Sequence, residues 1–473
     1  MSSTEASTGG SWAELFNRHH RGAIIVLAGG VAVFASNVYV TTSLLPSAIA
    51  DIGGERFYAW AMTTFLIASV FSSMFVSRLL SAGGPRRAYD VALALFGAGS
   101  VVAMAAPTMP VLLAGRTLQG LGGGLLAGLA FAVVRQALPE RLWKRSFGLV
   151  SAMWGLGNVL GPIIGGAFAG LGVWRLAFAL LAGAAAVLAW IAHRSLVTGA
   201  QSGARQPIAI VALLLIAAAT AAVSMSSVVD SDVLKGVLMA AAVALVIGFV
   251  LRERSSATRV LPAITYLPRS PLKWIYLSIV ILAVGSTTET FLPLFGQRLG
   301  ELSPLGAGLL GASLSWGWSA AQIATSGVTS KRAIEAIGVA GPLLLAVGLL
   351  SYAGLQADDA GTVRIALWFV ALIIAGSGIG MAFGTWIPAA MASAPDPAEG
   401  EKAAAGVNTV QLISNTFGSA LAGVLVTVGG PATLGSARTL GVGYAAIAGL
   451  GIVIAIHAIR AGRNHHEPVS AER

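Results

Sequence analysis

Cysteine is absent from the chain, and charged residues are scarce. Of the 473 residues, 10% are Asp, Glu, Lys or Arg, whereas 56% are hydrophobic. The absence of cysteine excludes disulfide bonds, thiol catalysis and thiolate metal sites. Because a soluble domain carries about 25% charged residues, this chain has too little charge to cover a surface that faces water. We therefore place it in a lipid bilayer.

Motifs for common enzyme chemistry are also missing. The chain has no phosphate-binding G-x-x-x-x-G-K-[ST] loop, so ATP is not the expected energy source, and it has neither a G-x-S-x-G nor an H-E-x-x-H motif. His457, His465 and His466 do not have the spacing of a metal site, because the last two are adjacent in a polar tail. We expect a protein that is not an enzyme and that has no cofactor or metal.

Apolar runs that are long enough to cross a membrane fill most of the chain. A transmembrane helix needs about 20 apolar residues, and this rule predicts an all-α integral membrane protein. The predicted transmembrane helices number fourteen: 23–46, 58–80, 88–106, 110–134, 147–170, 173–193, 207–226, 233–251, 273–296, 302–326, 334–355, 363–392, 405–429 and 440–462.

Positive charges are distributed unevenly between the two sides of this predicted membrane protein. With the N-terminus in the cytoplasm, 22 of the 29 Lys and Arg residues fall in cytoplasmic segments and six in outer segments, while Arg116 lies within a span. Because positive charge marks the cytoplasmic side, we predict a multi-pass protein of the cell membrane with both termini in the cytoplasm. The same distribution accounts for the net charge of +10 without a nucleic-acid partner.

Two short patterns occur twice in the chain in the same order. Residues 41–46 read T-T-S-L-L-P with a glycine at 53, and residues 288–293 read T-E-T-F-L-P with a glycine at 300. Likewise, R-R-A-Y-D at 86–90 parallels K-R-A-I-E at 331–335. We interpret these parallels as two copies of one six-helix unit; the alternative is chance similarity between apolar segments. Repeated helical units with a site near the membrane midplane are typical of transporters.

The repeat divides the chain into two pseudo-symmetric six-helix bundles that flank two inserted helices. The predicted segments are an N-terminal tail at 1–22, the first bundle at 23–193, a linker at 194–206, the inserted helices at 207–251, a cytoplasmic loop at 252–272, the second bundle at 273–462 and a C-terminal tail at 463–473.

Arg116 is a permanent cation within an apolar segment. A charge in a transmembrane helix costs several kcal/mol unless it is paired or faces water. Gln119 lies one helical turn further and faces the same side. We interpret Arg116 as a functional cation that governs protonation or binds substrate; the alternative is a structural arginine held by backbone carbonyls.

Glycines recur at helical spacing in the predicted helix at 147–170. Gly157, Gly161 and Gly165 repeat every four residues, Gly166 extends a neighbouring stripe, and Pro162 interrupts the helical hydrogen bonds. Small residues at this spacing permit close contact between helices. The pattern is compatible with a hinge and equally with static packing.

With these two motifs, the chain resembles the major facilitator superfamily, in particular its fourteen-helix drug:proton antiporters. Their R-x-x-Q-G motif corresponds to Arg116, Gln119 and Gly120. Their G-x-x-x-G-P-x-x-G-G core corresponds to the glycines at 157, 161, 165 and 166 with Pro162. The resemblance covers the whole chain, and it implies a two-bundle fold, alternating access and export driven by proton entry.

The sequence departs from this family pattern at two places. The cytoplasmic loop motif G-x-x-x-D-x-x-G-R-K/R latches the bundles in the family, but here Ser81 replaces its acid, followed by Gly84, Arg86 and Arg87, with Asp90 nearby. We expect an altered latch. In addition, the antiporters carry an aspartate nine residues before the proline at 46, where this chain has Asn37, which cannot titrate.

Glu289 is consequently the candidate for proton coupling. It is the acid that lies well inside a predicted span, four residues before a proline. Burial raises a carboxyl pKa and a nearby cation lowers it, so a carboxyl between these effects can exchange protons near neutral pH. The alternatives are a hydrogen-bonding role in the cavity wall, a position at the outer mouth, and attraction of cationic substrates.

Polar and aromatic residues within the spans are candidates for the substrate cavity. Polar side chains in a span usually face protein or water, and Asn408, Gln411 and Asn415 share one helix face. The full set is Asn37, Tyr39, Thr41, Trp154, Asn158, Asn408, Gln411 and Asn415. The alternatives are hydrogen bonding between helices for the polar residues and the interfacial aromatic belt for the tryptophan.

These observations favour a monomeric transporter that exports amphipathic small molecules in exchange for protons across the lipid bilayer. An uncoupled transporter for a specific metabolite or lipid is the alternative, and Asn37 and Ser81 favour it. A membrane-embedded enzyme or sensor is disfavoured, because the sequence offers neither a nucleophile with a base nor a soluble domain.

Overall fold

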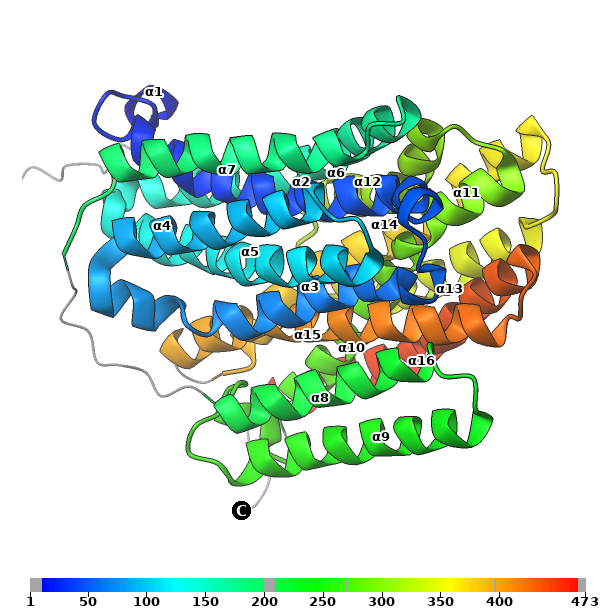
Figure 1. The fold of residues 1–473 in the computed structure, drawn as a ribbon. Coiled ribbons are helices and arrows are strands. Elements are labelled where there is room, and N and C mark those ends of the chain that lie inside the picture. Colours follow the sequence, from blue (N-terminus) through cyan, green and yellow to red (C-terminus); the bar gives the residue numbers. More distant parts are fainter. Residues whose placement is uncertain (1–10, 200–208, 269, 395–396, 467–473) are drawn as a thin grey trace, which may run out of the picture. The chain divides into compact units, whose positions relative to one another are not determined.

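In a computed structural model of the protein, residues 11–199, 209–268, 270–394 and 397–466 are described, and this part of the chain is helical without β-strands (Figure 1). Residues 1–10 and 467–473 of the predicted tails and 200–206 of the predicted linker lie outside the described residues. The contacts divide the chain into two compact units, one at 1–53 and 64–208 and the other at 54–63 and 209–473.

The helices of the first unit pack around α2 and α4. α2 contacts α5, α6 and α7, and α4 contacts α5 and α7. α2 ends where Gly53 and Gly54 both adopt positive φ angles, which glycine reaches without a steric penalty. The bounds are α1 Trp12–Leu15, α2 Arg21–Ile52, α4 Val76–Met104, α5 Met109–Ala137, α6 Glu140–Gly170 and α7 Arg175–Ser195, together with the 64–73 part of α3 Tyr58–Ser73.

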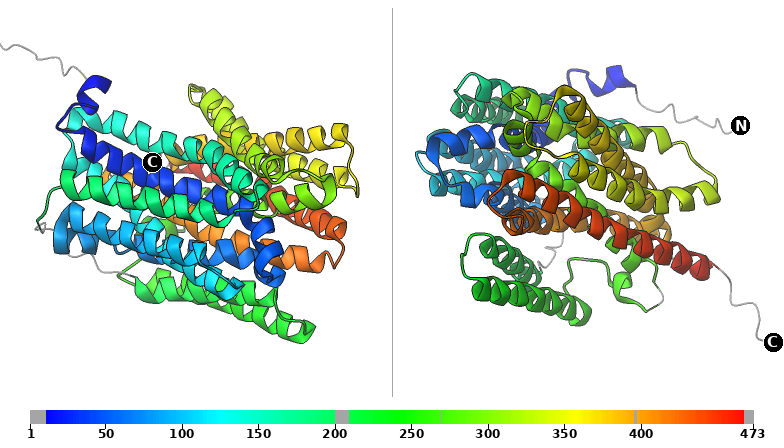
Figure 2. Two further views of the ribbon diagram at one scale, coloured as in Figure 1. Left: turned by 45° about the horizontal axis from the view of Figure 1, so that its top comes forward. Right: turned by 90° about the vertical axis from the view of Figure 1, so that its right-hand side faces the viewer.

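In the second unit, α10 contacts α14, α15 and α16, while α13 lies between α14 and α16. α8 and α9 form an antiparallel hairpin that contacts α15 (Figures 1 and 2). The bounds are α8 Ile210–Ser226, α9 Asp232–Ser255, α10 Leu272–Ser286, α11 Leu292–Gly300, α12 Pro304–Thr325, α13 Lys331–Leu355, α14 Thr362–Ala392, α15 Pro397–Val428 and α16 Thr433–His466.

Eleven helices in the described part of the chain are long and apolar enough to cross a membrane. They are α2, α4, α5, α6, α7, α9, α10, α13, α14, α15 and α16. α3 and α8 have 16 and 17 residues and fall outside this set, as does α12. The prediction of an all-helical, multi-pass membrane protein is confirmed.

The predicted loop at 81–87 contains the point at which the second and third spans separate. Helical geometry within Val76–Met104 is interrupted at Gly84, so a helix lies on each side of this residue. Gly84 has a φ of 73°, and a Cβ atom there would overlap the carbonyl oxygen of Gly199. The predicted span at 58–80 is itself divided, because α3 ends at Ser73 and α4 begins at Val76.

The predicted span at 273–296 is also interrupted. α10 ends at Ser286, a 3-10 turn (η3) covers Thr287–Thr290, and α11 begins at Leu292. Pro293 accounts for the break, because it has no N–H to donate to the carbonyl four residues earlier and its ring clashes with that group. This carbonyl belongs to Glu289, so the break coincides with the predicted proton-coupling residue.

Residues 54–63 group with the second unit, although the sequence assigns 58–63 to the first bundle. The Tyr58 ring stacks on Phe291 with a centroid separation of 4.7 Å. Trp60 Nε1 donates to the Ser224 carbonyl at 3.1 Å. Helices α8 and α9 group with the second unit as well.

Two small apolar clusters hold the α8–α9 hairpin against α15. In one cluster, Ile413 of α15 packs on Ile216 and Phe249. In the other, Ala420 of α15 packs on Val223 and Ala242, which lie in α8 and α9. These contacts fix the position of the α8–α9 hairpin within its unit.

Glu253 fixes the segment that follows α9. Its carboxylate is fully buried and accepts hydrogen bonds from the backbone N–H groups of Val260 at 3.0 Å and Leu261 at 3.1 Å, and from the Tyr266 hydroxyl at 3.1 Å. Burial, followed by the charge of Glu253, raises the pKa of Tyr266. Residues 260–266 of the predicted cytoplasmic loop at 252–272 are thus held by one carboxylate.

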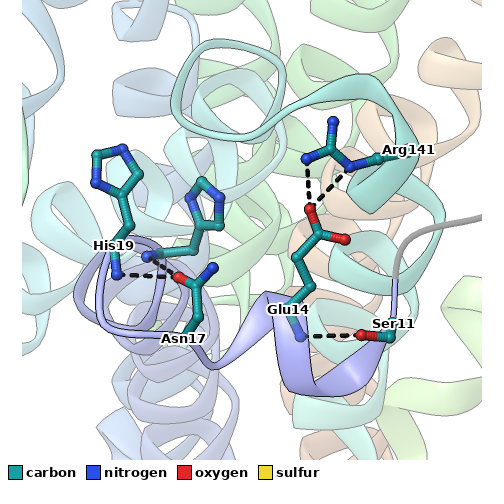
Figure 3. Close-up of polar contacts among 6 residues, drawn as sticks. Ser11, Glu14, Asn17, His19 and Arg141 are labelled. Carbon is teal, nitrogen blue, oxygen red and sulfur yellow. Dashed lines mark hydrogen bonds and ion pairs between the residues drawn. The ribbon is translucent and has the colours of Figure 1, made fainter.

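A short N-terminal segment is tied to the first turns of α6 (Figure 3). Leu15 of α1 is fully buried, and Arg141 Nε donates to Glu14 Oε1 at 2.8 Å. Asn17 Oδ1 accepts from the backbone N–H groups of His19 and His20 at 2.9 Å each. The hydrogen bond from Arg141 lowers the pKa of Glu14, and burial followed by the charge of His19 lowers the pKa of His20.

Acidification should loosen this N-terminal segment. A group with a lowered pKa stabilises the native state above its ordinary pKa, and this contribution is lost as the pH falls through the lowered value. The ordinary pKa is about 6.5 for histidine and about 4.3 for glutamate, so the contribution of His20 is lost before that of Glu14. Hydrogen exchange of residues 12–20, corrected for the intrinsic rate, should be faster at pH 5 than at pH 7.

His20→Asn should remove most of this pH dependence, whereas the matched change His457→Asn, at an exposed position of α16, should retain it. Equal exchange protection of the wild-type segment at both pH values would contradict the prediction.

Candidate functional site

Arg116 lies at the centre of a buried polar network in the first unit. Its side chain is fully buried in α5, and its Nη1 donates to Asn37 Oδ1 at 3.0 Å and to Gln119 Oε1 at 2.7 Å. Gln119 Nε2 in turn donates to Ser100 Oγ at 2.8 Å. The network thus joins α2, α5 and α4 through side chains.

An aromatic ring also contacts the Arg116 guanidinium. Its Cζ lies 4.3 Å from the centroid of the Phe65 ring, and the face of an aromatic ring attracts a cation. Amide oxygens and a ring face therefore stabilise the charge of Arg116. The structural alternative considered from the sequence was stabilisation by backbone carbonyls. The arrangement suits guanidinium, which combines a planar set of donors with a stacking face.

Asn37 is the residue through which α2 joins this network. Its side chain is fully buried, and its amide oxygen accepts the hydrogen bond from Arg116. An asparagine can accept this bond at every pH, because its amide does not titrate. At this position the chain has a permanent hydrogen-bond acceptor instead of a proton-binding group.

Glycines of α5 allow neighbouring helices to approach the network. A Cβ atom at Gly120 would overlap the Phe65 carbonyl oxygen, and one at Gly122 would overlap the backbone N–H of Phe96. Because neither position has a side chain, α3 and α4 pack directly on the backbone of α5. This close packing buries the segment that carries Arg116.

The glycines of α6 face α2. A Cβ atom at Gly157 would lie 2.6 Å from Ala35 Cβ, and one at Gly161 or Gly165 would overlap Tyr39 or Val40. Pro162 and Gly166 are buried in the same helix. The α2–α6 contact therefore depends on the absence of side chains along this stripe.

Several predicted cavity residues lie on these two helices. Tyr39 and Thr41 of α2 are buried, as is Asn158 of α6. Trp154 is 37% exposed, and its ring meets Phe34 edge to face with a centroid separation of 5.4 Å. Together with Asn37, five of the predicted cavity residues thus lie on α2 and α6, which contact each other.

Gly161→Leu should disrupt the α2–α6 contact. Overpacking a close contact costs about 1–3 kcal/mol, so we expect a thermal midpoint lower by several degrees and transport reduced at least tenfold. Gly155→Leu is the matched control on the same helix, because no atom lies within 4 Å of a Cβ atom at that position. A wild-type transport rate and a wild-type thermal midpoint in Gly161→Leu would show that the α2–α6 contact can accommodate a leucine side chain.

Glu289 lies in the helix break of the second unit. Its Oε2 accepts a hydrogen bond from Ser315 Oγ of α12 at 3.3 Å, and the residue is half-buried. Thr287 and Thr288 of the same 3-10 turn are buried, and Thr287 Oγ1 lies 3.0 Å from the Tyr444 hydroxyl of α16. An acid in an interrupted helix, hydrogen-bonded to a serine hydroxyl, is suited to bind a proton or a polar ligand.

The predicted amide row of α15 varies in burial. Asn408 is exposed, whereas Gln411 and Asn415 are half-buried. The three side chains follow one another along the helix, and α15 contacts α10, α14 and η3. Two of the three predicted amides are therefore partly enclosed by protein, and the third is exposed.

The predicted loop latch contains a partner that the sequence motifs did not indicate. Arg86 Nε donates to His193 Nδ1 of α7 at 3.2 Å, and Asp90 Oδ2 lies 3.8 Å from the same nitrogen. Arg87 is exposed, and Ser81 Oγ donates to the Arg78 carbonyl at 3.0 Å. Within the first unit, Arg86 and Asp90 therefore meet at a histidine of α7.

The described helices and the sites within them are those of a multi-pass membrane protein. A family model described as Major Facilitator Superfamily matches residues 27–401. The chain belongs to the major facilitator superfamily, and it is therefore a transporter and not an enzyme.

Two relatives from Mycobacterium tuberculosis strain H37Rv match most of the chain. A protein named "probable multidrug-efflux transporter" is 43% identical over 465 residues, which cover 97% of this chain and 98% of that protein. An uncharacterized MFS-type transporter is 27% identical over 431 residues, which cover 88% of this chain and 61% of that protein.

Solved transporter structures share the fold at low sequence identity. A POT family transporter in complex with 5-aminolevulinic acid superposes with a TM-score of 0.67 at 15% identity, over 94% of this chain and 97% of that one. A bacterial homologue of the human lysosomal transporter Spinster, in an inward-facing and occupied conformation, gives 0.60 at 13% identity, over 96% and 98% of the two chains.

Proposed function

We propose that the protein exports amphipathic small molecules across the cell membrane in exchange for protons, by alternating access. The name of the relative that is 43% identical supports export of the multidrug type. The proposed organisation is a monomer with fourteen transmembrane helices, in two pseudo-symmetric bundles plus the α8–α9 insertion. Both termini would lie in the cytoplasm, as the distribution of positive charge favours.

The observation that carries proton coupling is the position of Glu289 in the break between α10 and α11. Within the spans, its carboxylate is the proposed site where protonation and substrate binding compete. Such competition couples two fluxes when each ligand favours the opposite-facing state. The proposed role of Arg116 is that of a fixed cation that sets the electrostatic potential of the substrate cavity.

Proteoliposomes with an imposed pH gradient test this function. We expect uptake of amphipathic cations into the vesicle lumen to follow the gradient, and to collapse when a protonophore is added. The direct measurement is proton movement, reported by a pH-sensitive dye in the lumen, on addition of substrate. Substrate flux that is indifferent to the gradient would refute coupling.

Asn37 favours a second candidate, an uncoupled transporter of a specific metabolite or lipid. Its amide replaces the acid with which the antiporters bind protons at this position, and it satisfies Arg116 at every pH. This candidate predicts equal exchange rates with and without a pH gradient, and saturation by one class of substrate.

A further inference from the structure

A groove between α13 and α16 combines a cationic end with an aliphatic wall. It has a volume of about 500 Å³ and is open to the surface. Its charged lining residues are Arg332, Glu335, Arg460 and Arg463, and aliphatic residues such as Val339 and Ile456 form the wall. The two helices pack against each other (Figure 2), and all of these residues belong to one unit.

The charges of the groove are only partly balanced. Arg463 Nε donates to Glu335 Oε1 at 3.0 Å, and its Nη2 also bonds Glu335 Oε2. Glu335 thus neutralises Arg463 and holds its side chain at the edge of the groove. In the described part of the chain, neither Arg332 nor Arg460 takes part in an ion pair. Two guanidinium groups are therefore available for an anion.

The aliphatic wall continues along the surface of both helices. On α13, Leu343 and Leu350 follow Val339 at helical spacing and are 46% and 50% exposed; on α16, Val453 precedes Ile456 and is 53% exposed. In a membrane-spanning helix, such exposed aliphatic surface faces lipid. The groove therefore leads from two cations near the helix ends to a surface suited to hydrocarbon.

We propose that this groove binds an anionic phospholipid of the cytoplasmic leaflet. The phosphate lies between Arg332 and Arg460, and one acyl chain lies along Val339 and Ile456. Basic pockets between transmembrane helices on the cytoplasmic side are chemically suited to anionic head groups. The assignment of the leaflet rests on the proposed orientation, but the site does not depend on proton coupling or on the transported substrate.

Lipid-dependent thermal stability of the full-length, delipidated protein in detergent tests the proposal. Phosphatidylglycerol should raise the thermal midpoint more than phosphatidylcholine, and native mass spectrometry should detect a retained phosphatidylglycerol adduct. Arg332→Gln combined with Arg460→Gln should weaken the apparent affinity for phosphatidylglycerol at least tenfold. Both changes leave the Arg463–Glu335 bond in place.

Arg252→Gln combined with Arg254→Gln is the matched control, because it removes the same charge from exposed positions at the end of α9. It should retain the phosphatidylglycerol effect. An equal loss in both double variants would indicate general electrostatic attraction and overturn the proposal. An absence of any preference for phosphatidylglycerol in the wild type would do the same.

Ala336→Trp tests whether a lipid fills the groove, because the change narrows the groove without removing any charge. It should also lose the adduct, while its midpoint without lipid measures whether the fold is intact. A full phosphatidylglycerol effect in this variant would overturn the proposal. An equal stabilisation by sodium phosphate, or a groove-dependent dimer without lipid, would also overturn it.

Discussion

Replacing Arg116 with lysine should reduce the initial rate of transport at least 100-fold, although the charge is retained. Nη1 of Arg116 donates to Asn37 and Gln119, and the guanidinium Cζ lies over the Phe65 ring. An ammonium is a compact, strongly hydrated charge that does not reproduce the planar donors and the stacking face. Buried acceptors that lose their donor cost about 1–3 kcal/mol each, so the thermal midpoint should also fall by several degrees.

The measurement is uptake of a fluorescent cation into proteoliposomes at equal protein content. Arg78→Lys is the matched control, because Arg78 lies exposed at the start of α4, and it should transport like the wild type. A wild-type rate in Arg116→Lys would mean that only the charge matters and that the geometry of the network is irrelevant to transport.

Glu289→Gln should abolish gradient-driven transport and preserve exchange of substrate down its own gradient. The amide still accepts a hydrogen bond from Ser315 but cannot exchange a proton. The two readouts are proton movement on addition of substrate, which should disappear, and counterflow of labelled substrate, which should continue at a rate within about twofold of the wild type, since the hydrogen bond is kept.

Glu301→Gln makes the same chemical change at an exposed acid just beyond α11, and it should leave both readouts unchanged. Full proton movement in Glu289→Gln would remove Glu289 from the coupling mechanism. Loss of counterflow together with proton movement would assign this carboxylate to substrate binding instead.

The helical membrane architecture follows from local patterns in the sequence. Long apolar runs locate the helices, because a span must be apolar over its whole length. The contact between Arg116 and Gln119 follows from their spacing of three residues. The sequence also indicates Glu289, since a carboxylate in an apolar run is costly without a purpose.

Partners that are distant in the sequence could not be predicted in this way. Asn37 bonds Arg116 across 79 positions, and His193 bonds Arg86 across 107. No rule of sequence spacing predicts either pair, because packing between helices decides which side chains meet. Glu253 was missed for a related reason, since two of its three partners are backbone N–H groups, which every sequence supplies.

Helix ends were the other source of error. The apolar pattern of the span at 58–80 does not reveal the break between Ser73 and Val76 that separates α3 from α4. It also did not reveal that a 3-10 turn separates α10 from α11, although Pro293 was visible. A proline in a span can either kink a helix or interrupt it, and neighbouring helices determine which occurs.

The folded connection around Glu253 gives the inserted hairpin a mechanical link to the helix break. The segment after α9 is held by buried hydrogen bonds rather than left slack, and six residues after Tyr266 the chain enters α10, which leads to Glu289. A bilayer whose thickness does not match a hydrophobic hairpin exerts a tilting force on it. A thicker or thinner membrane that tilts α8 and α9 would therefore also act on the segment around Glu253 that precedes α10.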